Sequence, residues 1–213
     1  MINRQELKLK GKNAFRNNYW PCVCASIVLT VAVTGIMSYS TYSVQSGDQS
    51  TVETAAAALV GGISIIGYLL LKPLETGGKG FFLKNSDRPA SLNELARGYT
   101  QSFFNGILTY FLRDLFIALW SILLVIPGIM KAYSYRMVPY ILAENPDISP
   151  REALNRSSAM MNGYKMEAFM FDLSFIGWYL LAAVTLGLAG ILYGNPYRYA
   201  SDAELYKELR NRA

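Results

Sequence analysis

Long apolar blocks with few charges dominate the pattern of hydrophobic and polar positions along the chain. They span Trp20–Tyr39, Ala55–Leu74, Phe103–Met130 and Phe169–Tyr193. A helix of about 20 apolar residues matches the hydrocarbon thickness of a bilayer. The pattern therefore predicts an all-α chain of transmembrane helices.

The positions of the charges decide how many times the chain crosses. If each block crossed once, Arg151, Arg156 and Lys165 would lie outside the cell, against the preference of Lys and Arg for the cytoplasmic side. A turn at 126–128 with a return through 129–143, and a turn at 185–190 with a return through 191–206, remove this conflict.

The residues at the first of these turns suit a change of direction. Pro127 lacks the amide hydrogen that a helix interior needs, and Gly128 tolerates a turn. With both turns, the basic stretches at the N-terminus and in 72–97, 151–165 and 198–212 all lie inside. We therefore expect about six passes in the cell membrane, with both termini in the cytoplasm.

Composition agrees with a membrane protein. The chain is 52% hydrophobic and 16% charged, whereas an ordinary soluble domain is about 25% charged. The net charge of +5 comes from Lys and Arg near block ends, where they orient the protein and meet anionic headgroups. No nucleic-acid-binding motif accompanies them. The expected partners are the bilayer and anionic headgroups at its inner surface, with another membrane protein as a further candidate, but no nucleic acid.

Three stretches at the predicted inner surface share a layout. Each starts with a capping box, in which the first side chain caps a helix and a Glu follows three residues later. A large apolar residue follows nine residues after each Glu, and an Asn-rich or Asn-Gly break comes next. The boxes are Asn3–Glu6, Ser91–Glu94 and Ser149–Glu152; the apolar residues are Phe15, Phe103 and Met161; the breaks are Asn17-Asn18, Asn105-Gly106 and Asn162-Gly163.

This layout predicts a single domain, 1–213, built from three units of a short surface helix, an elbow and a hairpin. The units cover 1–74, 89–145 and 148–213. The alternative is a set of ordinary juxtamembrane helices that are capped independently. In the first unit, Leu7 and Phe15 share a helix with Lys8, Lys10 and Lys12, which suits a helix lying among headgroups with its apolar side inward.

Ionisable residues inside the blocks form the candidate site. A charge at membrane depth is costly, so such residues usually face the interior of a bundle. Arg113, Asp114, Arg136 and Asp172 are the candidate intramembrane polar cluster, with Asp172 opposite Arg113 or Arg136. The cluster would be a polar path or a headgroup site. The alternative is that long side chains near the inner surface extend to the headgroups. Lys131, Glu167, Arg198 and Asp202 also lie in or near the predicted passes.

Catalytic patterns are scarce. The chain has no His, which excludes His-based triads and metal sites. Cys22 and Cys24 are best interpreted as packing residues, and Gly77-Gly78-Lys79-Gly80 as a flexible basic loop. We therefore expect no enzyme activity, no cofactor and no metal.

One region resembles a known family. Ile126-Pro127-Gly128-Ile129, Pro139-Tyr140-Ile141-Leu142 and the stretch from Ser149 through Arg156-Ser157 to Asp172 and Trp178 carry the resemblance. The chain is similar, over nearly its whole length, to a bacterial family of integral membrane proteins, the domain-of-unknown-function family nine-seven-five. It also resembles the membrane domains of some glycerophosphodiester phosphodiesterases. The resemblance implies a six-helix membrane domain and supplies no activity and no catalytic residue.

Three functions remain open on this basis. The first is a non-catalytic membrane module that organises lipid or partner proteins. The second is a small transporter or exporter component with a polar path lined by Asp172, Arg113 and Arg136. The third is an intramembrane enzyme acting on lipid, for which Asp172 is the only carboxylate that the sequence nominates.

Overall fold

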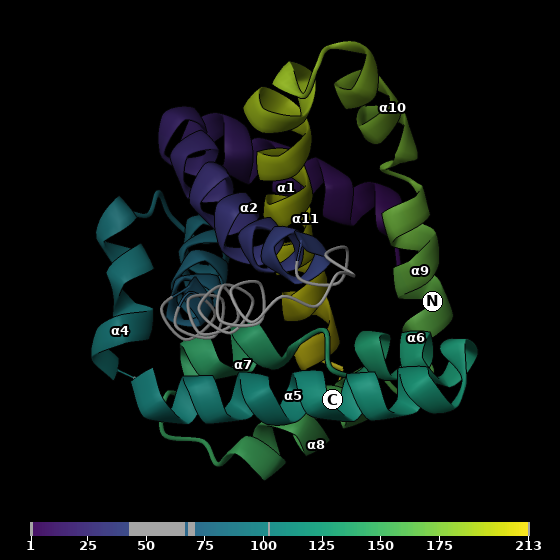
Figure 1. The fold of residues 1–213 in the computed structure, drawn as a ribbon. Coiled ribbons are helices and arrows are strands. Elements are labelled where there is room, and N and C mark those ends of the chain that lie inside the picture. The colour runs from purple at the N-terminus through teal and green to yellow at the C-terminus, as the bar shows by residue number, and fades with distance from the viewer. Residues whose placement is uncertain (1, 43–66, 68–70, 102, 213) are drawn as a thin grey trace, which may run out of the picture.

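The computed structural model describes residues 2–42, 67, 71–101 and 103–212, and within these ranges the regular structure is helical, with no strand. This confirms the all-α prediction for the described part (Figure 1). The elements are α1 (Arg4–Asn17), α2 (Tyr19–Tyr42), a helix over 71–85, η1 (Leu92–Ala96), α4 (Arg97–Gln101), α5 (Phe103–Leu123), α6 (Val125–Ser134), α7 (Val138–Glu144), α8 (Pro150–Met160), α9 (Lys165–Leu173), α10 (Ile176–Val184), η2 (Gly190–Gly194) and α11 (Asn195–Arg210). The predicted outer segment 40–54 and most of the block Ala55–Leu74 lie outside the described residues.

The third apolar block does turn back on itself, so that α5 and α6 pack side by side. The change of direction falls at Leu124, which has an extended backbone, two residues before the predicted turn. Gly128 has a different role from the expected one. It lies inside α6, and a Cβ there would stand 2.7 Å from the Cα of Ser121. Its lack of a side chain lets the two helices approach closely.

The last block also reverses direction where the sequence predicts it. α10 ends at Val184, and Leu186 and Gly187 then adopt positive φ of 50° and 89°. This left-handed backbone favours glycine. The chain returns through η2 into α11, which completes a second hairpin (Figure 1).

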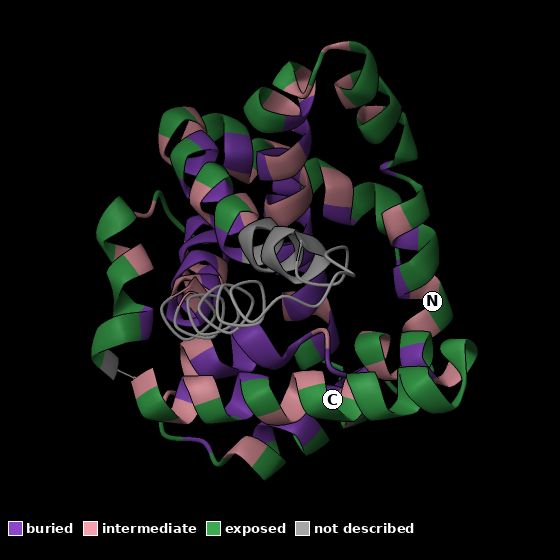
Figure 2. Cartoon of the chain, in the orientation of Figure 1, coloured by how far each residue is buried: buried purple, intermediate pink, exposed green. Residues whose placement is uncertain are grey.

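The most polar of the predicted passes, α11, lies at the centre of the molecule. It packs against α1, α2 and η2, and Figure 2 shows it among other helices. Ten of its residues are buried, among them Asp202 and Glu204. A helix that is surrounded by protein needs no lipid-facing surface, which explains why its sequence is not apolar.

α1 is held by protein along its apolar side. Leu7, Gly11 and Phe15 are buried, and a Cβ on Gly11 would lie 2.6 Å from the Cα of Ser201 in α11. The expected insertion of this side into the headgroup region is therefore wrong, because α11 already covers it. At the exposed side, Lys10 pairs with Glu6 at 2.7 Å, and this hydrogen bond lowers the pKa of Glu6.

Two of the three predicted helix caps form. The Asn3 side chain accepts from the amide of Glu6, and the Ser149 side chain accepts from the amide of Glu152. The prediction for Ser91 is wrong. Its helix, η1, has the tighter i to i+3 pattern, so the amide of Glu94 donates to the carbonyl of Ser91 instead.

The elbow asparagines bind the loops that lead into the next surface helix. Asn18 donates to the Ala90 carbonyl at 2.9 Å, and Asn105 donates to the Ile148 carbonyl at 2.6 Å. Ala90 and Ile148 each directly precede the residue at a helix start, Ser91 and Ser149. The expected break at Asn105-Gly106 is wrong, however, because both residues lie inside α5. The third elbow uses Gly163, at a φ of 80°.

The glycine-rich stretch 77–80 is helical, which corrects the predicted flexible loop. A Cβ on Gly77 would collide with the carbonyl of Leu95, and a Cβ on Gly98 would collide with the carbonyl of Pro73. The glycines therefore hold the helix over 71–85 against η1 and α4. These close backbone contacts set the position of the helix and therefore also the positions from which its charged side chains extend.

Large apolar side chains remain on the outside. Two helical stretches, Phe103–Leu123 and Lys165–Val184, are long and apolar enough to cross a membrane, and only 17% of an apolar 18-residue window in each is buried. Figure 2 shows the exposed surface of α5, α9 and α10. Phe104, Ile122 and Val184 are more than four-fifths exposed, at 83%, 84% and 82%.

Candidate functional site

A break between α6 and α7 places the arginine at the centre of the site. Pro139 lies in the first turn of α7, and its ring and missing amide hydrogen disfavour a continuous helix through 135–137. The Ser157 hydroxyl of α8 bridges the break: it accepts from the amide of Met137 at 3.1 Å and donates to the carbonyl of Ser134 at 2.8 Å. Arg136 lies within this break.

Arg136 binds two carboxylates from two other helices. Its guanidinium donates to both oxygens of Asp172 in α9, at 2.7 and 2.9 Å. It also donates to Asp202 in α11. Asp202 pairs in addition with Lys79 of the helix over 71–85, at 3.0 Å. Four segments that are distant in sequence thus meet at this one ion-pair network.

Tyrosines complete the surroundings of these charges. The Tyr133 hydroxyl donates to Asp172 at 3.0 Å and the Tyr140 hydroxyl to Asp202 at 3.3 Å. The Lys79 ammonium lies 5.1 Å from the ring centre of Tyr140 and 4.8 Å from that of Tyr199, within the range of a cation–π interaction.

A second group of charges lies on α5. Arg113 bonds to its neighbour Asp114 at 2.8 Å and pairs with Glu75 at 3.3 Å. Lys72 pairs with Glu75 at 3.2 Å and with Asp114 at 3.4 Å. The Arg113 guanidinium also lies 4.7 Å from the ring centre of Tyr110. This group connects α5 to the helix over 71–85.

The four residues nominated from the sequence therefore fall into two groups. Asp172 lies opposite Arg136, which is one of the two pairings expected, and no Asp172–Arg113 pair occurs among the described contacts. Of the other ionisable residues in the blocks, Lys131 lies 5.5 Å from the ring centre of Trp120, and Glu167 accepts from the amide of Ile2.

Several members of the network were not nominated. Lys72, Glu75 and Lys79 belong to the stretch 72–97, which its basic residues predict to lie inside, and the glycines around Lys79 predict a loop there. Arg198 and Asp202 lie in the predicted sixth pass but outside the candidate cluster. A helical interpretation of 71–85, with Glu75 and Lys79 four residues apart on one face, would have found the first three.

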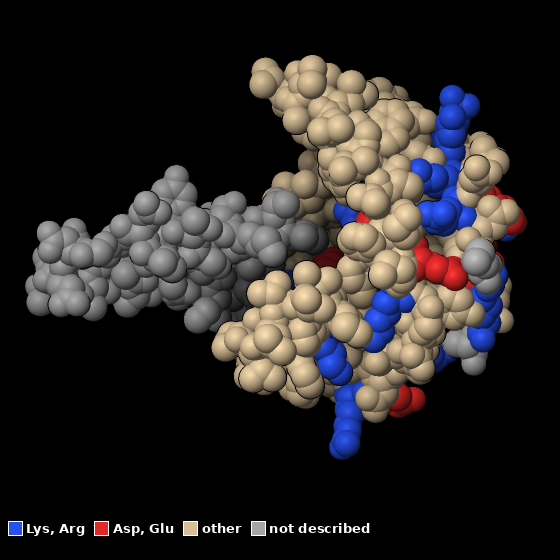
Figure 3. Space-filling model, turned by 90° about the vertical axis from the view of Figure 1, so that its right-hand side faces the viewer, with Lys and Arg blue, Asp and Glu red and all other residues tan. Residues whose placement is uncertain are grey.

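The two groups of charges line one cavity of about 320 Å³. Its lining includes four basic side chains, Lys79, Arg113, Arg136 and Arg198, and three acidic ones, Glu75, Asp172 and Asp202. Figure 3 shows charged side chains in a hollow between two largely uncharged lobes. We call this space the central cavity.

The arrangement is suited to holding helices together and to binding ions. Bidentate arginine–carboxylate pairs are strong and directional when water is scarce. Among the described residues, no group of three His, Cys, Asp or Glu side chains is placed to hold a metal ion. Each acidic side chain of the central cavity has a cationic partner.

Comparison with known proteins gives one similarity. No curated protein and no solved structure matches the chain. A family model matches the second part of the chain, which includes the stretch from Ile126 to Trp178 but leaves residues 1–121 outside, short of the near full-length resemblance expected. Residues 122–213 are thus similar to the family described as "Protein of unknown function (DUF975)".

Proposed function

We propose that this chain is a six-pass integral membrane protein and a non-catalytic module that organises lipid or partner proteins. The observation that carries the membrane assignment is the exposure of the two helical stretches Phe103–Leu123 and Lys165–Val184, in each of which only 17% of an apolar 18-residue window is buried. The core helix of a soluble protein would be mostly buried. Neither stretch lies near the N-terminus, as a signal sequence would.

Charge placement supports an orientation with both termini in the cytoplasm. The two described turns, around Leu124 and at 185–189, carry no Lys or Arg. The surface helices α1 and α8 both carry exposed basic residues, including Arg4, Arg16 and Arg151. Basic residues prefer the cytoplasmic side of a membrane. The three-unit organisation is part of the proposal, and the matching bonds of Asn18 and Asn105 support it.

The ion-pair network favours a structural role over catalysis. A catalytic carboxylate needs room to reach a substrate, but Asp172 is held by both nitrogens of Arg136 and by Tyr133. Asp202 is almost fully buried, with 7% of its side chain exposed. These carboxylates join helices from different parts of the chain. The similarity to membrane domains of glycerophosphodiester phosphodiesterases stays a prediction from the sequence.

Topology is tested by single-cysteine labelling in intact cells, starting from a variant in which Cys22 and Cys24 are replaced by Ser. A membrane-impermeant maleimide should label a cysteine at Leu186, at the turn, and should spare one at Arg151 unless the cells are opened. Labelling of Arg151→Cys in closed cells would contradict the proposed orientation. Release of the protein from membranes by alkaline carbonate would contradict membrane insertion itself.

Transport is a second candidate because the central cavity lies between helices and is lined by charges. In that case, purified protein in sealed liposomes would produce saturable solute flux. Asp172→Asn and Arg136→Gln would abolish the flux without preventing insertion. If the protein is instead a scaffold without a transport path, the wild-type protein will produce no flux.

A further inference from the structure

The charges that line the central cavity do not cancel. Among the described residues, four basic and three acidic side chains face it, which leaves one positive charge in excess. Lys72 and Asp114, the two members of the network outside the lining, have opposite charges and pair with each other at 3.4 Å. This pair adds no net charge to that of the described lining. A cavity with an excess of one sign of charge attracts ions of the opposite sign, and a bound anion would neutralise this excess.

Arg198 is the basic residue whose bonding is least complete. Its shortest described ion pair, to Asp172, is 3.5 Å long, whereas Arg136 approaches the same carboxylate at 2.7 Å. Its Nε is buried and has no hydrogen-bond partner among the described residues. A guanidinium has five N–H donors in a planar fork that fits the oxygens of phosphate or carboxylate. Arg198 thus retains donors for an anion.

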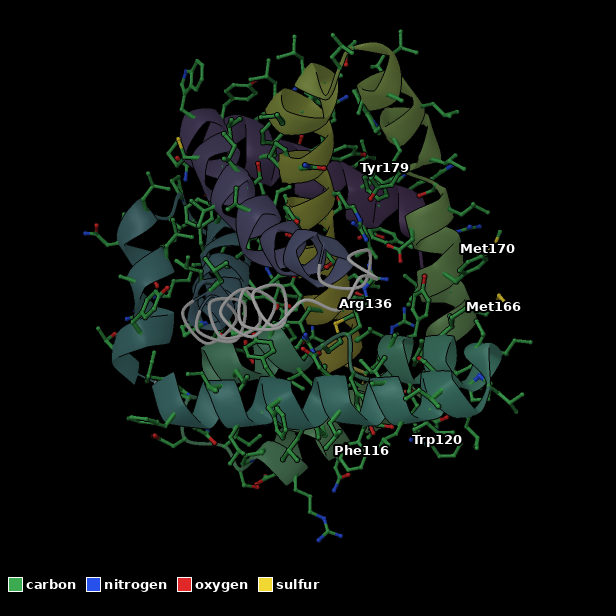
Figure 4. The ribbon with its side chains drawn as sticks, viewed as in Figure 1. Phe116, Trp120, Arg136, Met166, Met170 and Tyr179 are labelled. Carbon is green, nitrogen blue, oxygen red and sulfur yellow. The ribbon has the colours of Figure 1, made fainter. Side chains whose placement is uncertain are left out.

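The cavity side of Arg198 is reachable. Its side chain is 35% exposed, against 12% for Arg136 and 7% for Asp202. Its guanidinium lies 5.8 Å from the ring centre of Tyr179, which is itself 45% exposed. In Figure 4, Arg136 and Tyr179 point to the interior between α9 and α11, while Met166 and Met170 point away from it. Polar groups therefore gather in the space between α9 and α11, whereas the outer side of α9 is apolar.

We propose that the central cavity binds a phosphate group, with Arg198 as its main ligand-binding residue. The phosphate would belong to an anionic lipid headgroup or to a soluble phosphate ester. Of these two sources, the lipid headgroup agrees better with the apolar outer surfaces next to the cavity. This part of the proposal rests on the membrane function proposed above. Phosphate oxygens accept the free Arg198 donors and neutralise the excess charge.

The test measures thermal unfolding of the full chain in dodecyl maltoside by the fluorescence of its tryptophans. One arm adds dioleoylphosphatidylglycerol and compares it with dioleoylglycerol, which lacks the phosphate. A second arm adds sn-glycerol 3-phosphate or inorganic phosphate and compares each with chloride at equal ionic strength. Each arm uses wild-type protein, Arg198→Gln and the control Arg151→Gln, which removes an exposed arginine of α8 outside the cavity lining.

We expect phosphatidylglycerol to raise the unfolding temperature of wild-type protein and of Arg151→Gln. Arg198→Gln should need about tenfold more lipid for a half-maximal rise, the effect of one lost charged hydrogen-bonding group. If Arg198→Gln does not fold, Arg198→Lys replaces it and should show a smaller loss of affinity, because it keeps the charge but not the fork.

The two arms separate the sources of the phosphate. A rise with the lipid alone identifies a headgroup, and a rise with the soluble compounds as well identifies recognition of the phosphate group itself. Equal half-maximal concentrations for Arg198 and Arg151 variants, or no rise with any phosphate compound, would overturn the proposal. Failure of the membrane assignment is a separate result, since it is read from carbonate extraction and not from unfolding.

Discussion

A single hydroxyl, that of Ser157, satisfies two backbone groups at the break between α6 and α7. The sequence could predict a helix interruption near Pro139, because proline disfavours a continuous helix. It could not predict the partner, which lies 20 residues beyond Met137 on another helix. Non-local bonds of this kind depend on how helices pack, and no local pattern encodes them.

Replacement of Ser157 by Ala should lower the free energy of unfolding by about 1–3 kcal/mol, because the amide of Met137 and the carbonyl of Ser134 lose their shared partner. The matched control is Ser158→Ala, since the neighbouring hydroxyl makes no hydrogen bond with the described part of the chain. Urea unfolding in detergent measures both. Equal effects of the two substitutions would refute the assigned role.

Arg136→Gln should be more damaging, by about 3–5 kcal/mol, because the buried carboxylate of Asp202 and the half-buried one of Asp172 lose a cationic partner. The double variant Arg136→Gln with Asp202→Asn should recover part of that loss, since it removes one of the unpaired charges. The same urea experiment compares the two. If the second substitution made the first one worse, the proposed pairing would be wrong.

At the scale of elements, the sequence predicts the Asn-containing elbows but not the hydrogen bonds that their asparagines make. The capping boxes depend on residues three apart, and two of three formed as predicted. The cap predicted at Ser91 does not form because η1 adopts the tighter helix, which no residue pattern in this stretch predicts. The glycines of 77–80 suggested flexibility, whereas their function is close packing against a neighbouring backbone.

The elbows give a prediction with an internal control. Asn105→Ala removes donors to the carbonyls of Pro146 and Ile148, at 2.8 and 2.6 Å, and should lower the unfolding temperature by several degrees. Asn162→Ala at the third elbow should have little effect, because that side chain is exposed. Thermal unfolding in detergent compares them. Equal shifts would show that the Asn105 bonds contribute nothing measurable.

For the whole molecule, the apolar blocks and the distribution of basic residues led to hairpins, and the turns around Leu124 and Leu186 agree with that prediction. The candidate site was less predictable. Arg136 and Asp172 were paired correctly as one of two alternatives, while Glu75 and Lys79 were missed. The ion pairs of these two residues depend on how the helix over 71–85 packs between the other helices, and the sequence pattern does not predict that packing.

The exposed apolar surface gives a prediction for the purified protein. Removal of detergent should cause aggregation, because many large side chains of α5, α9 and α10 are exposed. Transfer into lipid nanodiscs should preserve a single dispersed species. Size-exclusion chromatography distinguishes these results. A dispersed protein in buffer without detergent or lipid would contradict the proposed membrane environment.

The buried position of α11 has a consequence for biogenesis. The ribosome makes this helix after every other described helix, yet it supplies Asp202, a carboxylate that Arg136 and Lys79 both bind. During synthesis, both cations therefore precede the counter-ion that they share. We expect water to solvate these charges until α11 is made and completes the network.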